Sequence, residues 1–226
     1  MHDKIIAVAK KTIETEGKAI MHLSSLIGNE FAEAVDYIYQ SKGRVIVTGI
    51  GKSANIATKI VATLNSTGTP AIFMHAADAI HGDLGIIQEN DTVICISKSG
   101  NTPEIKVLVP LIKASGNKLM GLTSNRESFL GQQSDYVLNA YVEKEACPNN
   151  LAPTTSTTAQ LVMGDALAMS LLELRGFSSR DFARFHPGGS LGKKLYLRVS
   201  DLTSLNATPQ VSLDTGIKEV IVEISE

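Results

Sequence analysis

The sequence predicts an α/β fold in which a five-stranded parallel sheet is flanked by helices. Five short apolar runs alternate with helix-like segments, and such runs are typical of strands that are covered on both faces. Because a helical segment separates each run from the next, neighbouring strands are expected to run parallel through right-handed crossovers. The predicted strands are 44–49, 71–75, 91–97, 118–124 and 136–140.

Helical periodicity accounts for the segments before and between these strands. The first forty residues read as two helices, the first of which is amphipathic. The predicted helices that follow include 53–68, 103–116 and 156–176, and Gly176 is placed to end the last of them. The apolar positions of the first helix are Ile5, Ile6, Ala9, Ile13, Ile20 and Leu23.

Bulk composition limits the kind of protein and its compartment. With 226 residues, the chain suits one domain at 1–200 and a tail at 201–226. A net charge of −2 without a basic run argues against a nucleic-acid partner, and the absence of a run of about 18 apolar residues argues against a membrane span. The charged start does not resemble a signal peptide, and two distant cysteines, Cys95 and Cys147, fit the reducing cytoplasm.

The loop after the first predicted strand contains Gly51, Lys52 and Ser53. It lacks the upstream glycine of a P-loop, and a weak G-x-G-x-x-A match ends at Ala54. A dinucleotide site would need an acidic residue near the end of the second strand, but that strand ends at 73–75 without one, so we discount a dinucleotide ligand. A smaller phosphate ligand at the helix N-terminus remains, with Lys52 as a candidate functional residue. The alternative is that Lys52 is a solvated surface lysine.

The loop after the third predicted strand brings hydroxyl groups to a second helix N-terminus. Ser97, Ser99 and Thr102 surround a glycine, Thr102 suits an N-cap, and proline follows at the first helical position. Hydroxyls and free backbone N–H groups predict a phosphate cradle that needs no lysine. The alternative is an ordinary capped helix in which Glu104 is favoured by the helix dipole.

Hydroxyl residues also open the long helix at 156–176. Their number exceeds the needs of one cap, so we interpret them as lining a pocket or holding phosphate oxygens, although a capped, exposed helix start is the alternative. The candidate binding residues of this stretch are Thr154, Thr155, Ser156 and Thr157.

Two histidines are further candidates. His186 precedes a glycine-rich stretch at 187–193, which suggests a positioned imidazole, and His81 lies at 79–83. A structural role is the alternative for each. His75, His81 and Asp83 lie close in sequence, but no tight Cys/His spacing indicates zinc, so we expect no metal and no cofactor.

Several of these loops together resemble the SIS (sugar isomerase) family, and specifically its arabinose 5-phosphate isomerase branch. The matching stretches are TGIGKSANIATKIVATLNSTGTP, HAADAIHGDLG, ISKSGNTPEI, KEACPNNLAPTTSTTAQLVMGDALA and FARFHPGGSLGKKL, which span about residues 44–200. The resemblance implies a flavodoxin-like or Rossmann-like three-layer sandwich and a homotetramer with shared active sites. It implies reversible conversion of D-ribulose 5-phosphate and D-arabinose 5-phosphate for Kdo and lipopolysaccharide synthesis.

The resemblance also implies roles for individual residues. Lys52, Glu104, His81 and His186 occupy the positions of the family's catalytic groups, and the loop of Ser97, Ser99 and Thr102 matches its phosphate site, with Ser53 nearby. We assign Glu104 as the base, Lys52 to stabilising the enediolate or orienting the sugar, and the histidines to ring opening or proton shuttling.

The sequence departs from the family pattern at three positions and at its end. Ala54 and Asn55 stand where glycine and histidine are common, and Asn101 stands where glutamate is usual. The stretch 201–226 looks like the start of a CBS domain.

Two alternative functions and one regulatory hypothesis accompany the resemblance. One is a different SIS isomerase, such as a phosphoheptose or hexulose-phosphate isomerase, and another is a non-catalytic regulator that binds phosphosugars. The third is feedback inhibition, in which CMP-Kdo competes at the isomerase site.

Overall fold

A computed structural model describes residues 1–189 and 210–225 of the chain. The chain divides into two compact units, Met1–Phe177 and Ser178–Glu226. The domain boundary predicted between residues 200 and 201 lies outside the described residues.

Five parallel strands form one sheet in the first unit, in the order β2-β1-β3-β4-β5. This confirms the predicted fold class. The two strands β1 and β3 are buried throughout, as their unbroken apolar runs predict. The strands are β1 (Val45–Gly49), β2 (Ala71–His75), β3 (Thr92–Ile96), β4 (Lys118–Thr123) and β5 (Tyr136–Asn139).

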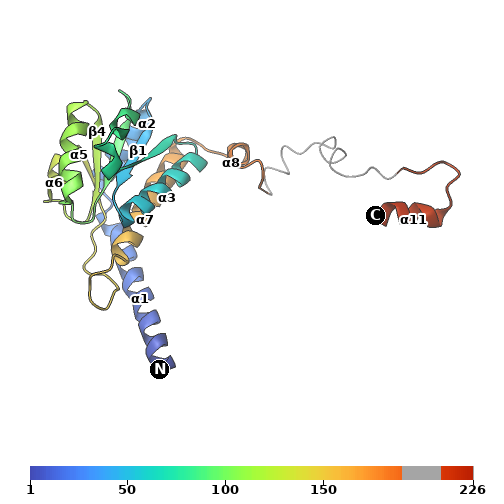
Figure 1. Ribbon diagram of the computed structural model, residues 1–226, viewed down its shortest axis with the longest axis horizontal. Coiled ribbons are helices and arrows are strands. Elements are labelled where there is room, and N and C mark those ends of the chain that lie inside the picture. The colour runs from blue at the N-terminus through green and yellow to red at the C-terminus, as the bar shows by residue number, and fades with distance from the viewer. Residues whose placement is uncertain (190–209, 226) are drawn as a thin grey trace. The chain divides into compact units, whose positions relative to one another are not determined.

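Helices cover both faces of the sheet and make a three-layer sandwich. Figure 1 shows α5 and α6 on one side of the strands and α3 and α7 on the other. One buried apolar cluster joins the sheet to α2, α3 and α7, and a second joins it to α4, α5 and α6. The helices of this unit are α1 (His2–Leu23), α2 (Asn29–Gln40), α3 (Lys52–Ser66), α4 (Ala76–Ala79), α5 (Pro103–Ala114), α6 (Phe129–Gln133) and α7 (Thr155–Leu174).

Helix α1 extends past the sheet instead of covering it. Figure 1 shows its N-terminal end well away from the strands. Leu23 is its one buried residue, whereas Ile5 is 59% exposed and Ile13 is 72% exposed. The predicted helix is therefore confirmed, but the apolar residues of its first half do not enter the core of this chain.

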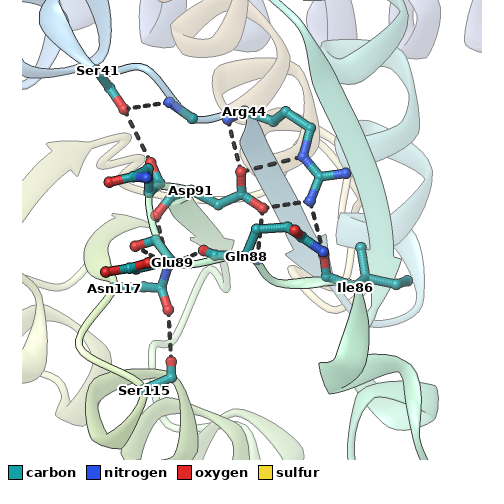
Figure 2. A network of polar contacts seen from close by, with 10 residues as sticks. Ser41, Arg44, Ile86, Gln88, Glu89, Asp91, Ser115 and Asn117 are labelled. Atoms are coloured by element: carbon teal, nitrogen blue, oxygen red, sulfur yellow. Dashed lines mark hydrogen bonds and ion pairs between the residues drawn. The ribbon is translucent and has the colours of Figure 1, made fainter.

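A polar network fastens the amino-terminal edge of the sheet (Figure 2). The Asp91 carboxylate, which is almost fully buried, accepts hydrogen bonds from the Arg44 backbone and guanidinium and from the Gln88 backbone at 2.7–3.2 Å. Arg44 also donates to the Ile86 carbonyl at 2.9 Å, and Asn117 donates to the Gln88 and Asp91 carbonyls. Burial alone would raise the pKa of Asp91, but the Arg44 and Gln88 donors lower it.

This network joins the residues that precede or begin three strands. Arg44 precedes β1, Asp91 precedes β3 and Asn117 precedes β4. The strand register pairs Val45 with Thr92 and Thr92 with Lys118, so the network lies directly beside the paired ends. It therefore fixes the register of three adjacent strands at one edge.

The second unit has two described helices, α8 (Ser179–Phe185) and α11 (Ile217–Ser225). Ser178 and Asp181 form a reciprocal capping box at the start of α8. His186 is the C-cap residue of this helix, and its ring stacks on Phe182 with ring centroids 3.9 Å apart. Across both units, no helix of the described residues is long and apolar enough to cross a membrane.

Candidate active site

A cavity of about 300 Å³ lies at the carboxyl ends of β1 and β3, where open parallel sheets bind ligands. It is bounded by the starts of α3 and α7 and by the loop between β3 and α5. Seven predicted site residues line it, which are Lys52, Ser53, Ser97, Ser99, Thr102, Ser156 and Thr157. The parallel register explains their meeting, because it brings the ends of β1 and β3 to the same edge.

The loop between β3 and α5 has the geometry of a preformed anion cradle. Ser97 Oγ lies 2.9 Å from Thr102 Oγ1 and accepts the Gly100 N–H at 3.1 Å, while Ser99 Oγ accepts the Asn101 N–H at 3.2 Å. Gly100 has φ of +66°, and a Cβ there would lie 1.9 Å from Ser128 Oγ. The backbone therefore folds into a tight turn that only glycine fits, beside the N-terminus of α5.

Thr102 occupies the predicted N-cap position of α5, with Pro103 at the start of the helix. Its side chain makes no capping hydrogen bond and instead contacts Ser97. The first N–H groups of the helix are therefore left for a ligand, which favours the interpretation as an anion site over that of an ordinary capped helix.

Lys52 starts α3, and its side chain lines the cavity. Gly51 is the N-cap of this helix. Within the described residues, Lys52 forms no ion pair, so its charge is available to an anionic ligand. Lys98 is a second cation of the cavity, but its ammonium is 2.6 Å from Glu145 Oε1, which offsets its charge.

Glu145 caps the long helix α7 from a preceding loop. Its side chain is 1% exposed, and Oε2 accepts the backbone N–H groups of Thr154 at 2.9 Å and Ser156 at 3.1 Å. Burial alone would raise the pKa of Glu145, but the donors from Lys98, Ser156 and Thr154 lower it to about 2. The carboxylate is thus a resident anion at this helix N-terminus.

Glu145 changes how the hydroxyl stretch at 154–157 is interpreted. The Thr154 and Ser156 amides already donate to Glu145, and Thr154 Oγ1 accepts the Ala146 N–H at 3.0 Å. Thr155 is buried, and neither Thr154 nor Thr155 lines the cavity. Only Ser156 and Thr157 of this stretch remain at the cavity wall.

Two predicted catalytic residues of the first unit, Glu104 and His81, do not line the cavity. Glu104 is half-buried in the first turn of α5, beside the cradle. His81 is exposed on the turn after α4, and His186 belongs to the second unit, which is described by itself. Within the first unit, the cavity lining therefore includes Lys52 and several hydroxyl residues but not Glu104 or His81. Among the described residues, no three His, Cys, Asp or Glu side chains are grouped to hold a metal ion.

The sequence interpretation missed Lys98, Glu145 and Gln160. Gln160 lines the cavity one helical turn after Ser156, at 1% exposure, and Ser53 Oγ donates to its Oε1 at 3.3 Å. The spacing of Ser156 and Gln160 on one helix face was the available signal. No signal marked Glu145, because the residues that it contacts, Thr154, Ser156 and the distant Lys98, form no recognised motif with it.

Comparisons with known proteins give matches over most of the chain. The family model described as SIS domain matches residues 37–170. The arabinose 5-phosphate isomerase KdsD of Pseudomonas aeruginosa is 48% identical over 218 residues, which are 96% of this chain and 67% of that protein. The arabinose 5-phosphate isomerase KpsF of Escherichia coli is 45% identical over 222 residues, 98% of this chain and 70% of that protein.

A solved structure is also similar. A protein of Escherichia coli CFT073 in complex with arabinose 5-phosphate is 39% identical, with a TM-score of 0.80, and the match covers 83% of this chain and 100% of that one. This chain spans about two thirds of the length of the two curated relatives.

Proposed function

The chain belongs to the SIS domain family, and from this premise we propose that it is an aldose–ketose isomerase that interconverts D-arabinose 5-phosphate and D-ribulose 5-phosphate. The observation that carries the proposal is the cavity itself, which is lined both by the preformed loop of Ser97, Ser99 and Thr102 and by Lys52. The arabinose 5-phosphate bound in the similar Escherichia coli CFT073 structure supports the substrate. We further propose a role in Kdo and lipopolysaccharide synthesis in the cytoplasm.

In the proposed reaction, the phosphate fixes the substrate and leaves the carbonyl end for proton transfer. The phosphate accepts hydrogen bonds from the Ser97–Thr102 loop and the first N–H groups of α5, which supplies remote binding energy. Glu104 removes the proton from C2 of the aldose, an enediolate forms, and the proton returns to C1. Lys52 stabilises the negative oxygen of the enediolate. Glu145 is a weaker candidate base, because a carboxylate with a pKa of about 2 accepts protons poorly near neutral pH.

We propose that the site is completed in a homotetramer. His81 is exposed on its turn, and Ile5 and Ile13 on α1 expose apolar surface beyond the sheet. A neighbouring subunit that covers this part of α1 can bring His81 or His186 to the cavity for ring opening. We expect Ile5→Glu with Ile13→Glu to lower the mass measured by light scattering below four chains and to reduce turnover. A mass that stays unchanged in this variant would contradict the role of α1.

Regulation is a separate part of the proposal. A CMP-Kdo product of the downstream pathway would compete at the isomerase site, since both ligands are anionic sugar derivatives. The expected result is a rise in the melting temperature with CMP-Kdo and a competitive pattern of inhibition. If CMP-Kdo neither stabilises the protein nor inhibits it, this part fails while the isomerase proposal stands.

The direct test is a proton NMR time course with D-arabinose 5-phosphate in deuterated water. We expect D-ribulose 5-phosphate to appear with deuterium at C1, because the enediolate exchanges its proton with solvent. The Glu104→Gln variant should bind the sugar phosphate but lose turnover by about 10²-fold or more. Binding without conversion in the wild-type protein would instead indicate another SIS isomerase or a phosphosugar-binding regulator.

A further inference from the structure

Gln160 and Ser53 form a polar pair at the part of the cavity wall where α3 meets α7. Gln160 is 1% exposed, and its Oε1 accepts the hydroxyl hydrogen of Ser53 at 3.3 Å. The two helices approach closely, because a Cβ at Gly164 on α7 would lie 2.4 Å from the Ile60 side chain on α3. The pair therefore sits on two rigid, tightly packed helices.

The direction of this hydrogen bond decides what the pair can bind. A serine hydroxyl has a single hydrogen, and Ser53 donates it to Gln160 Oε1, so only the lone pairs of Ser53 Oγ remain for a ligand. The Gln160 amide nitrogen keeps its donors, since no hydrogen bond of Nε2 is found within residues 1–189 and 210–225. The pair thus offers one acceptor and one donor side by side.

This combination suits a neutral hydroxyl and disfavours phosphate. A sugar hydroxyl can donate to Ser53 Oγ and accept from Gln160 Nε2 at once, whereas a phosphate dianion only accepts and would face the Ser53 lone pairs. The phosphate is better served by the Ser97–Thr102 loop, where the first N–H groups of α5 are left uncapped by Thr102. The pair and the Ser97–Thr102 loop, which line the same cavity, therefore differ in hydrogen-bond chemistry.

We propose that Ser53 and Gln160 form a hydroxyl-recognition subsite that positions the sugar part of a phosphorylated polyol or sugar, separate from the phosphate cradle. The inference rests on the proposed function for the identity of the sugar phosphate. It places Ser53, which was expected near the phosphate site, on the sugar part of the ligand, and it assigns a specificity role to a glutamine that no sequence motif marked.

The test separates sugar recognition from phosphate recognition by calorimetric titration of one variant with two ligands. Gln160→Met keeps the side-chain length and removes both hydrogen-bonding groups. We expect its Kd for inorganic phosphate to stay within about twofold of wild type and its Kd for D-arabinose 5-phosphate to rise about tenfold. An equal loss of affinity for both ligands, or no loss for the sugar phosphate, would overturn the proposal.

A second variant guards against a folding defect and adds a signature of a shared subsite. Ser53→Ala should reproduce the selective loss, and the double variant should bind D-arabinose 5-phosphate little worse than either single one, because both act on the same hydroxyl. Additive losses would show that the two residues act separately and would refute the pair.

In the Gln160→Met variant, the preference for binding D-arabinose 5-phosphate over its C2 epimer D-ribose 5-phosphate should also fall. The fall should be about tenfold if the hydroxyl that the pair binds is the one at C2. Failure of the proposed function is visible separately, as wild-type protein that binds D-arabinose 5-phosphate without converting it.

Discussion

Replacement of Glu145 by glutamine should make the stability of the protein less dependent on pH in the acidic range. The substitution keeps the shape of the side chain and an oxygen acceptor but removes the charge that Lys98 and the α7 amides stabilise. In the folded protein the opposing effects of burial and these donors leave the pKa of Glu145 at about 2, below its ordinary value of 4.5. The carboxylate therefore favours the folded state whenever it is ionised.

The magnitude follows from the size of this shift. At about 1.36 kcal/mol per pKa unit, a fall from 4.5 to about 2 corresponds to on the order of 3 kcal/mol. Because the Lys98 side chain is 42% exposed, solvent screens its contribution, and we expect about 2 kcal/mol. Because folding lowers the pKa of this carboxyl group, its contribution to the free energy of unfolding is complete above pH 4.5 and is lost as the pH falls toward 2.

Urea unfolding at a series of pH values from 7 down to 3 measures the effect. At pH 7 the Glu145→Gln variant should be less stable by about 2 kcal/mol, which is about 4–8 °C in melting temperature, and the difference should shrink toward pH 3. Glu143→Gln is the matched control, since it removes an exposed carboxylate from the same loop. A difference between wild type and Glu145→Gln that is absent, or constant from pH 7 to 3, would refute the reasoning.

Two further substitutions test the two ends of the strands, one for ligand binding at the carboxyl ends and one for stability at the amino ends. Gly100→Ala should weaken the binding of inorganic phosphate at least tenfold in a titration, because Gly100 has φ of +66° and the new Cβ would meet Ser128. Gly116→Ala is the control, since Gly116 also has a positive φ, +81°, but open space around it, and it should leave phosphate binding unchanged. Asp91→Ala should lower the free energy of unfolding by about 3 kcal/mol in urea, because it leaves Arg44 and buried amides without an acceptor. The same variant should keep its KM, and a selective rise in KM at unchanged stability would contradict a purely structural network.

The sheet could be predicted from sequence because its strands are marked by local patterns. The run at 91–97, for example, became β3 at Thr92–Ile96, and each of the other four runs also holds one strand. The first helix shows what such local patterns do not predict. Its apolar spacing predicts a helix but does not say what covers Ile5 and Ile13, and here the helix passes beyond the sheet.

The candidate site was predictable in so far as it lies in loops at strand ends. Ser97, Ser99 and Thr102 met Lys52 because parallel strands bring their carboxyl ends to one edge. The role of the 154–157 stretch was not predictable, because its amides are satisfied by Glu145, a residue with no local motif. Side-chain partners set by tertiary structure leave no periodic trace in the sequence.

The Arg44–Asp91 network gives the two edges of the sheet different tolerances to change. At the amino edge, the donors of Arg44 and Asn117 are bound to neighbouring carbonyls and to Asp91, and these bonds align β1, β3 and β4 there. The loops at the carboxyl ends carry the cavity residues and are not the only contacts that align the strands. Their residues can be exchanged for others that fit a different sugar while the scaffold stays aligned, which is one physical reason why a single architecture can serve many phosphorylated ligands.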